Sequence, residues 1–450
     1  MSTAILNAYL RHAIERKDYL AVRQFLSEFQ AVDLADLLQL ESIENAHELL
    51  TYLPDEQRAD AFGHLPASRQ QQLATAMADD EVSQLLRHLD ADEGADLLHL
   101  LPEQRHDRVL RSIARKEREN LRRLAGHQES TAGAIMTCDY ATVPADVTVG
   151  KALTIVRSTA PDVELIYQLY VVDAHHHLLG TLSLRELILS APGACIRDLM
   201  TTDLITIPVM DDQERAAKLI SRYDLMSLPV VDDDNRLVGI ITYDDAMDVA
   251  EAEATEDMHK GATVSHLAVN FRDAHFFTLY RKRILWLLLL VFGNLFSGAG
   301  IAYFEDIIAT YVVLVFFLPL LIDSGGNAGS QAATLVIRSI ATGDTNLHDW
   351  GKLLKKELIV ATGLGLTMAA AVSLIGAYRG GPDIALVVAL SMICTVLAGS
   401  LVGLCLPFML IRFGFDPATA STPLVTTIAD AAGVVIYFWI ATLVLHLPAP

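Results

Sequence analysis

The sequence has little positive charge and few cysteines for its 450 residues. Lys and Arg number 34 against 55 Asp and Glu, and the net charge of −21 argues against nucleic acid as a partner, because phosphate binding requires clustered basic side chains. The four cysteines, at positions 138, 195, 394 and 405, lack the spacing of metal ligands, and we interpret them as buried reduced thiols. The chain also has no P-loop, nucleophile elbow or HExxH motif, so we expect no enzyme activity. Cations are the natural partners of so acidic a chain.

Apolar residues are abundant instead, and they are unevenly distributed. Hydrophobic residues make up 52% of the chain and the mean hydropathy is +0.34, although charged residues still make up 20%. Acidic residues dominate up to about residue 283, and apolar runs dominate after it. The N-terminal stretch lacks the apolar run of a signal peptide. We therefore expect an acidic soluble part that stays in the cytoplasm, followed by a membrane part.

Residues 1–130 are rich in Leu, Ala, Gln and Glu and contain almost no Gly. An apolar residue followed by Pro, Ala or Asp recurs about every twelve residues, and Pro at such a point suits the first turn of a helix, where its missing N–H costs nothing. The steps begin at Leu53, Leu65, Met77, Leu89, Leu101 and Ile113. They predict short stacked helices, that is, an α-helical solenoid N-domain. Acidic residues at the turns, such as Asp80, Asp90 and Glu93, either stabilise helix N-termini or form a cation-sensing face.

Residues 131–255 contain two similar copies of a small β-α unit. Each copy is predicted to form strand, helix, strand, turn, strand and helix. Val171-Val172-Asp173 and Leu179-Gly180 in the first copy correspond to Val230-Val231-Asp232 and Val238-Gly239 in the second. The pair resembles tandem cystathionine-β-synthase-type (CBS) domains, which implies two α/β modules that sense a ligand.

The CBS resemblance also implies a site for an adenosine nucleotide, with ATP as the candidate ligand. In that family, a Gly-x-x-Thr/Ser-x-x-Asp turn holds the nucleotide. Gly239, Thr242 and Asp245 fit this turn. The first copy has Glu in place of the Asp, at Glu186, and fits it less well.

An acidic helix, residues 244–270, is predicted to connect the soluble and membrane parts. Its sequence DDAMDVAEAEATEDMHK combines strong helix formers with many carboxylates. Like charges one turn apart, as at Asp244 and Asp248, destabilise a helix by roughly 0.2–0.5 kcal/mol unless a cation lies between them. The stretch is therefore either a solvated linker or a cation-binding helix.

Five apolar runs in the last part of the chain are long enough to cross a bilayer. They are residues 284–303, 307–337, 357–377, 384–411 and 423–446. Basic residues precede the first run and lie between the second and third, and this bias places the N-terminus inside and the C-terminus outside. We therefore expect an all-α membrane domain of five transmembrane helices over residues 284–450.

Asp430 is a carboxylate within the fifth apolar run. A charge near the centre of such a run costs about 2.5–3.5 kcal/mol on insertion, so it usually faces a water-filled path or a partner. The second run carries the polar stretch DSGGNAGSQ, residues 323–331, which we interpret as a break in the helix that lines a cavity. The residues alone leave Asp430 either a metal site or a proton relay.

The two membrane motifs, PLLIDSGGNAGSQAATLVIRSIATGD and DPATASTPLVTTIADAAGVVIYF, follow the CBS pair and the helical N-domain. In this order the chain resembles the MgtE family of magnesium channels over nearly its whole length. The resemblance implies a homodimer in the lipid bilayer whose second and fifth helices line one pore. It implies that Asp430 holds Mg²⁺ largely through the water shell of the ion, with Asp416 at the cytoplasmic mouth. The positions implied in the second helix are Gly325, Gly326 and Asn327, and Asp323 receives no role.

The same resemblance implies that cytoplasmic Mg²⁺ regulates the pore. The acidic helix matches the plug helix of the family, and its carboxylates would bind regulatory Mg²⁺ together with an N-domain carboxylate. The positions implied are Asp80, Asp244, Asp245, Asp248, Glu251, Glu253, Glu256 and Asp257. The expected function is import of Mg²⁺ across a bacterial-type inner membrane, stopped by high cytoplasmic Mg²⁺. Two alternatives stay open: a Co²⁺ or Mg²⁺ transporter coupled to H⁺ or Na⁺, and a membrane-anchored sensor.

Overall fold

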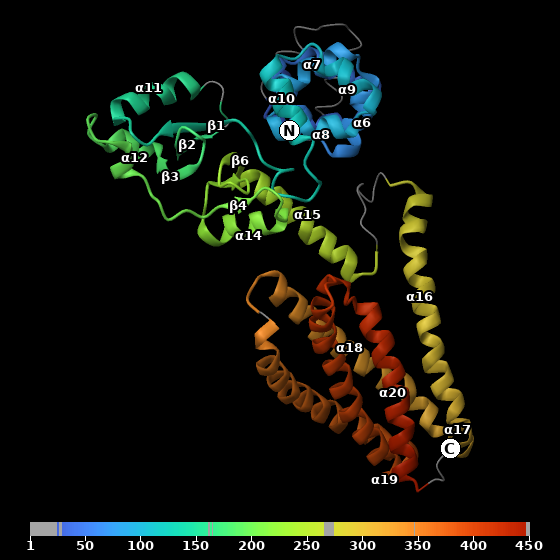
Figure 1. Cartoon of the computed structure of the whole chain (residues 1–450). Coiled ribbons are helices and arrows are strands. Elements are labelled where there is room, and N and C mark those ends of the chain that lie inside the picture. The colour runs from blue at the N-terminus through green and yellow to red at the C-terminus, as the bar shows by residue number, and fades with distance from the viewer. Residues whose placement is uncertain are drawn as a thin grey trace. The chain divides into compact units, whose positions relative to one another are not determined.

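The computed structural model describes residues 25–26, 29–160, 163, 165–264, 274–345 and 347–446. The chain divides into two compact units, Met1–Glu253 and Ala254–Pro450, and the division falls within one long helix, α15 (Tyr243–Gly261) (Figure 1). The predicted domains extend into residues 1–24, 265–270 and 447–450, which lie outside the described residues.

The N-domain coils as a chain of short helices. They are α3 (Ala31–Leu40), α4 (Ile43–Tyr52), α5 (Asp55–Gly63), α6 (Ala67–Ala76), α7 (Asp79–Leu86), α8 (Ala91–Leu100), α9 (Glu103–Leu110) and α10 (Arg115–Leu124). From α3 to α10, each helix packs against the helix after next, which gives the solenoid seen in Figure 1. The predicted helical N-domain is confirmed, with one helix for each step of the repeat.

The prolines of the repeat lie one residue earlier than predicted. Pro54, Pro66 and Pro102 are the N-caps of α5, α6 and α9 and not residues of the first turn. An N-cap needs a carbonyl that accepts the first intrahelical hydrogen bond, and the carbonyl of Pro54 accepts one from the backbone N–H of Arg58 at 2.8 Å. The apolar residue before each of these caps, such as Leu53, is buried against the solenoid core.

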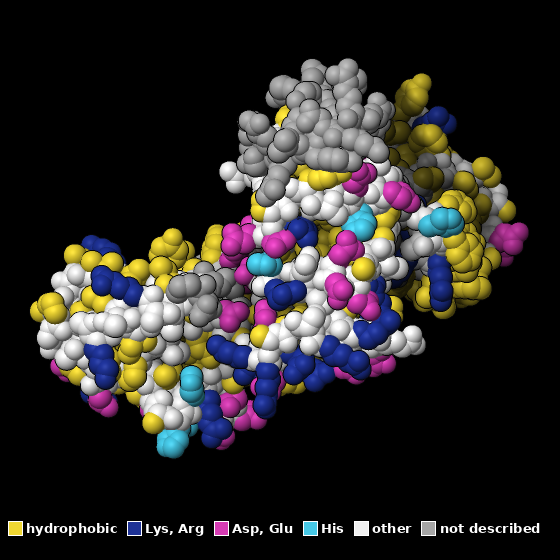
Figure 2. Space-filling model, turned by 90° about the horizontal axis from the view of Figure 1, so that it is seen from above, with side chains coloured by type: hydrophobic (Ala, Val, Ile, Leu, Met, Phe, Trp, Pro, Cys, Tyr) yellow, Lys and Arg dark blue, Asp and Glu magenta, His cyan; other side chains and the backbone are white. Residues whose placement is uncertain are grey.

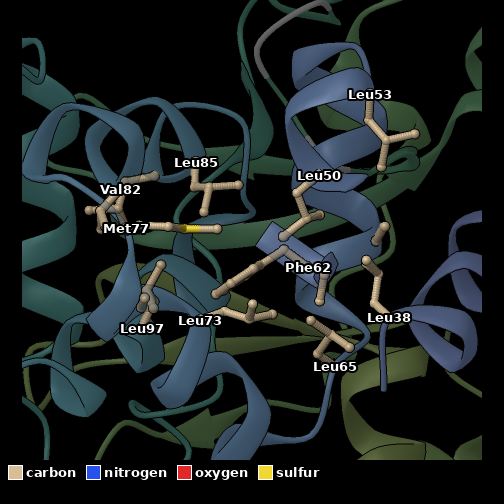
Figure 3. Close-up of a cluster of buried hydrophobic side chains, with 14 of the residues drawn as sticks. Leu38, Leu50, Leu53, Phe62, Leu65, Leu73, Met77, Val82, Leu85 and Leu97 are labelled. Atoms are coloured by element: carbon tan, nitrogen blue, oxygen red, sulfur yellow. The ribbon is translucent and has the colours of Figure 1, made fainter. Parts of the chain in front are cut away.

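Apolar side chains from successive helices form the core along the inside of the solenoid (Figure 3). Phe62 of α5, Leu73 of α6 and Val82 of α7 are fully buried. Burying a side chain of this kind contributes about 1.5–3 kcal/mol. The solenoid thus presents its polar residues, and among them its carboxylates, on its outer surface and at its turns.

Two three-stranded sheets with the same topology follow. The first has β1 (Tyr140–Pro144), β2 (Leu165–Val172) and β3 (Leu178–Ser183), and the second has β4 (Ile207–Pro208), β5 (Ser227–Val231) and β6 (Leu237–Thr242). In each sheet the first strand pairs in parallel with the second, and the second pairs antiparallel with the third. The helices between them are α11 (Val149–Thr159), α12 (Leu184–Leu189), α13 (Ile196–Leu199) and α14 (Gln213–Tyr223). This duplication confirms the predicted pair of α/β modules.

The membrane domain contains four helices that are long and apolar enough to cross a bilayer in the described residues. Its elements are α16 (Phe276–Tyr303), α17 (Glu305–Thr310), α18 (Val313–Ala341), η2 (Leu347–Asp349), α19 (Trp350–Arg412), η3 (Pro417–Thr419) and α20 (Thr422–Val444). The 63 residues of α19 are too many for one span, and Gly381, with φ of 82°, interrupts them. A Cβ atom added at Gly376 would lie 2.9 Å from Cα of Ala385, so the chain doubles back there. Residues 350–380 and 382–412 are therefore two spans, which gives the predicted five.

Contacts between the spans fix their relative directions. Gly293 lies against Thr427 and Gly300 against Val434, so α16 and α20 are parallel. Leu314 lies against Tyr437 and Gly326 against Thr426, so α18 and α20 are antiparallel. The two halves of α19 are antiparallel, as the turn at Gly381 requires. The spans thus alternate in direction along the chain.

The polar stretch 323–331 does not break the second span, contrary to our prediction. It is helical throughout, within α18, and its glycines allow close packing. A Cβ atom added at Gly399 would lie 2.0 Å from the carbonyl oxygen of Gly325, and one added at Gly403 would lie 2.0 Å from that of Gly329. Backbones in such contact require glycine, and the packing offsets the cost of about 1 kcal/mol that each glycine adds in a helix interior.

Two further details differ from the sequence analysis. The run 307–337 begins within α17, which ends at Thr310, and its span is α18, which begins at Val313. The four cysteines are free, as expected, but none is fully buried, and Cys394 is exposed on α19. A small apolar thiol is tolerated on the outer surface of a membrane helix, so burial is not required there.

Candidate ion path and regulatory carboxylates

Asp430 lies partly buried on α20, where that helix packs against α18. A Cβ atom added at Gly326 of α18 would lie 3.4 Å from its Oδ1. Gly326 therefore leaves room for the carboxylate of Asp430. Asp430 itself lies about 12 Å from the start of α20, at 1.5 Å per residue. Gly325 faces the other way, because its Cβ would lie 3.1 Å from the carbonyl oxygen of Thr395 on α19. Of the two predicted glycines, the structure thus brings only Gly326 to Asp430.

A polar stripe runs along one exposed face of α18. It consists of Asp323, Asn327, Gln331, Thr334 and Arg338. Spacings of three and four residues keep these side chains on one side of the helix. Polar side chains at membrane depth usually face a bundle interior or a water-filled path. One copy of the chain leaves the polar stripe uncovered, although it lies on a span that is long and apolar enough to cross a bilayer.

Asn327 and Asp323 form a pair at the start of the polar stripe. The amide Nδ2 of Asn327 donates a hydrogen bond to Oδ2 of Asp323 at 2.9 Å. Asp323 lies about one helical turn before Gly326, the residue of α18 that leaves room for Asp430. The sequence placed Asn327 in the ion path and gave Asp323 no role. The available signal was its position one helical turn before Asn327.

At the end of the fourth span, Asp416 contacts the last turn of α15. Its Oδ1 caps η3, and its Oδ2 accepts a hydrogen bond from Nζ of Lys260 at 2.6 Å. Lys260 also lies 2.6 Å from Oε1 of Glu256. Burial acts to lower the pKa of Lys260, but the hydrogen bonds to Asp416 and Glu256 outweigh it and raise that pKa above its ordinary value. Two carboxylates that we predicted as Mg²⁺ ligands therefore share one ammonium group.

Carboxylates of the N-domain face the start of α15 within the first unit. Burial raises the pKa of Glu93 to about 8, and the charges of Asp90, Asp245 and Asp60 add to the effect. The carboxylate of Glu93 lies against Gly63, where an added Cβ atom would be 2.4 Å from its Oε1. The sequence pointed to Asp90 and Glu93 among the turn residues but not to Asp60, which lies inside a helix and meets them only through the coiling of the solenoid.

Asp245 is the α15 residue whose charge acts on Glu93. Burial raises its pKa to about 6, and Asp244 and Asp248 contribute, although a hydrogen bond from the Thr242 hydroxyl acts in the opposite direction. Burial likewise raises the pKa of Asp248, with Glu251 and Asp244 adding to it. The predicted regulatory residues at the start of α15 therefore repel one another when all are ionised.

The remaining predicted regulatory residues are placed differently. Asp80 is exposed in the first turn of α7, while its neighbour Asp79 pairs with Arg105 at 2.8 Å. Glu253 accepts a hydrogen bond from Gln213 at 3.0 Å. Among the residues that the structure describes, no group of three or more His, Cys, Asp or Glu side chains is arranged so that it could hold a metal ion. The regulatory carboxylates are thus neighbours without forming a ready coordination shell.

The predicted nucleotide-binding residues lie together at the end of β6 and the start of α15. The hydroxyl of Thr242 donates a hydrogen bond to Asp245 and so stabilises the start of α15. A Cβ atom added at Gly239 would lie 2.5 Å from Sδ of Met136. Glycine at this position is therefore required by packing, whether or not a nucleotide binds.

Three family models match the chain in the order of its domains. One, described as "MgtE intracellular N domain", matches residues 29–130, and the CBS domain model matches residues 132–192 and 196–252. A third, described as "Divalent cation transporter", matches residues 318–440. The magnesium transporter MgtE of Thermus thermophilus is 36% identical over 442 residues, which are 97% of this chain and 98% of that protein. The chain belongs to the MgtE family of magnesium transporters.

Further similar proteins support the same assignment. The magnesium transporter MgtE of Bacillus subtilis is 33% identical over 425 residues, 94% of each chain. The crystal structure of the cytosolic domain of the Mg²⁺ channel MgtE in complex with ATP is 34% identical, with a TM-score of 0.51, and covers 53% of this chain and 98% of that one. The soluble part of a magnesium transporter is 29% identical, with a TM-score of 0.52, over 56% of this chain and all of that one.

Membership in the family confirms the main expectations from the sequence. The chain is a multi-pass membrane protein with an intracellular N-domain and tandem CBS domains, and it transports magnesium. The MgtE family is not an enzyme family, as the missing catalytic motifs had indicated.

Proposed function

We propose that the chain forms a pore through which Mg²⁺ enters the cell, with Asp430 as the ion-binding residue. The observation that supports this most directly is the position of the Asp430 carboxylate against Gly326, beside the polar stripe of α18. Mg²⁺ dehydrates reluctantly and keeps several waters when one or two carboxylates bind it. The polar stripe offers hydrogen-bonding groups for those waters, and Asn327 is one of them.

The pore in this proposal is shared by two copies of the chain. A second copy across a two-fold axis would cover the polar stripe and bring a second Asp430 to the path. Exposed apolar side chains at matching places of the two CBS modules, Tyr167 with Met226 and Ile188 with Met247, support a duplicated contact surface. Five alternating spans would then carry the C-terminus to the outside. A single-chain mass for the intact protein in detergent would contradict the dimer.

Uptake of Mg²⁺ into liposomes driven by membrane potential alone tests the pore. We expect the wild-type chain to take up Mg²⁺ without any gradient of H⁺ or Na⁺. Asp430→Asn keeps the size of the side chain and removes its charge, and it should reduce uptake by about tenfold or more. Asp383→Asn, which changes an exposed carboxylate at the turn within α19, is the matched control and should retain uptake. Wild-type uptake by Asp430→Asn would rule out the assignment.

A transporter coupled to H⁺ or Na⁺ is the second candidate. It is favoured by the carboxylate chemistry of Asp430, because an intramembrane Asp also serves as a proton relay. The same liposomes separate the two candidates. Uptake that requires an imposed pH or Na⁺ gradient in addition to voltage would favour the coupled transporter.

The gate in this proposal is α15, and it closes when cytoplasmic Mg²⁺ binds the carboxylates around it. The carboxyl groups of Glu93 and Asp245 are partly buried, and burial, with repulsion from neighbouring carboxylates when these are ionised, raises the pKa of each. Carboxylate oxygens are the ligands that Mg²⁺ prefers, and a divalent cation would relieve this repulsion. Mg²⁺ therefore binds more tightly to the state that holds these groups together, which is the closed state in this proposal. Because imported Mg²⁺ then closes the pore, the difference in affinity produces negative feedback. The Lys260–Asp416 contact fixes the other end of α15 to the membrane domain.

ATP is proposed as a further ligand of the CBS pair, at Gly239, Thr242 and Asp245. The support is the related cytosolic domain that has been solved with ATP. Because Thr242 now bonds to Asp245, ATP would compete with that hydrogen bond or share it. If ATP leaves the thermal unfolding of the intact protein unchanged, this part of the proposal is wrong.

A further inference from the structure

Asp323 is a second carboxylate at membrane depth, and no basic side chain among the described residues forms an ion pair with it. It is exposed on α18 and lies about 15 Å from the start of that helix, at 1.5 Å per residue. The only basic residue of α18 is Arg338, in the last turn. A carboxylate in such a place faces water or a charged partner, because hydrocarbon would cost it several kcal/mol.

The hydrogen bond from Asn327 orients Asp323 without removing its charge. Nδ2 of Asn327 donates to Oδ2 of Asp323 at 2.9 Å, across one turn of α18. An amide is an uncharged donor, so it fixes the rotamer of the carboxylate without adding a positive charge beside it. The other oxygen, Oδ1, is left to accept hydrogen bonds from water.

Asp323 and Asp430 come from different helices and act on the same place. Gly326, which leaves room for the carboxylate of Asp430, follows Asp323 by about one turn of α18, so both carboxylates lie near this part of α18. Two carboxylates that face one path repel each other when no cation is present. A cation between them removes that repulsion, and a divalent ion gains twice the Coulomb energy of a monovalent one at the same distance.

We propose that Asp323 is a selectivity-determining residue of the ion path. Its carboxylate, held by Asn327, accepts hydrogen bonds from the water shell of an Mg²⁺ ion that Asp430 binds. The pair of carboxylates thereby favours divalent over monovalent cations, and in a two-copy pore it supplies four negative charges. This inference rests on the proposed pore and adds to it a residue that sets selectivity and not conduction alone.

The test measures the Mg²⁺-to-Na⁺ permeability ratio from reversal potentials in bilayers that contain the intact protein. Asp323→Asn should still conduct but lower this ratio by about tenfold, since it removes one charge near the ion. Asp323→Glu keeps the charge and should stay close to the wild-type ratio. Asp383→Asn is the control and should leave the ratio unchanged. If the asparagine variant does not reach the membrane, Asp323→Ser removes the same charge and should give the same shift.

The outcomes separate this inference from the pore itself. A wild-type ratio in both Asp323→Asn and Asp323→Ser, together with loss of Mg²⁺ current in Asp430→Asn, would overturn the role of Asp323 and leave the pore in place. Normal current in Asp430→Asn would overturn the pore. A lowered ratio in the two uncharged variants, restored by glutamate, supports the proposal.

Discussion

At the scale of single residues, the sequence reveals a functional residue when its chemistry contrasts with that of its neighbours along the chain. Asp430 could be predicted because a charge within an apolar run is visible without a structure. Asp60 and Asp323 could not be assigned, because their significance depends on which helices pack together: Gly63 of α5 lies against Glu93, and Gly326 of α18 lies against Asp430. The packing of α5 with α8 and of α18 with α20 therefore supplied what the sequence lacked.

Glu93 gives the first unit a pH-dependent stability. Its pKa is about 8 in the folded chain against an ordinary value of 4.5, so between these values the folded chain binds more protons here than the unfolded chain does. The stabilising contribution of Glu93 is therefore complete below its ordinary pKa and is lost as the pH rises through its folded-state pKa. In Mg²⁺-free buffer we expect the unfolding temperature of the intact protein to fall over this range and Glu93→Gln to flatten the dependence.

The control for this prediction is Glu119→Gln, because Glu119 is an exposed N-domain carboxylate that pairs only with Arg115 among its described neighbours. Its substitution should leave the slope of unfolding temperature against pH as it is in the wild type. A slope that survives Glu93→Gln unchanged would show that burial of Glu93 does not control this stability.

At the scale of helices and strands, periodic signals were reliable and glycine signals were ambiguous. The step of about twelve residues predicted the helices of the solenoid, and the duplicated strands predicted the two sheets. Glycine marks either a break or a close helix contact, and the sequence does not show which partner a helix meets. At Gly381 the chain turns back, whereas Gly325 and Gly329 remain helical against α19.

Lys260 tests whether the end of α15 controls the pore. Lys260→Gln removes the ion pairs with Asp416 and Glu256 and so weakens the closed state. Both partners are about one-third exposed, so the loss should be modest, about 0.5–1 kcal/mol, and closure should need roughly two- to fivefold more cytoplasmic Mg²⁺. Lys352→Gln, at an exposed lysine of α19, is the control. An unchanged or lower Mg²⁺ requirement in Lys260→Gln would exclude this role.

At the scale of the whole molecule, the net charge of −21 belongs to a chain whose last part is apolar. On the face shown in Figure 2, acidic and basic side chains lie interspersed, so the acidic side chains do not form one continuous patch there. Within the first unit, burial raises the pKa of Glu93 and of Asp245, and the charges of neighbouring carboxylates add to both shifts. The composition predicted cation binding, but only the folded chain shows where the charges concentrate.

Recordings from excised patches, with Mg²⁺ varied on the cytoplasmic face, test the central claim most directly. We expect wild-type pores to conduct when that Mg²⁺ is micromolar and to close when it is millimolar. Neutralising the acidic residues of α15 together should leave a pore that conducts at both levels. The positions to change are Asp248, Glu251, Glu256 and Asp257. Wild-type pores that stay open at millimolar Mg²⁺, or neutralised pores that still close as the wild type does, would contradict a pore closed by cytoplasmic Mg²⁺.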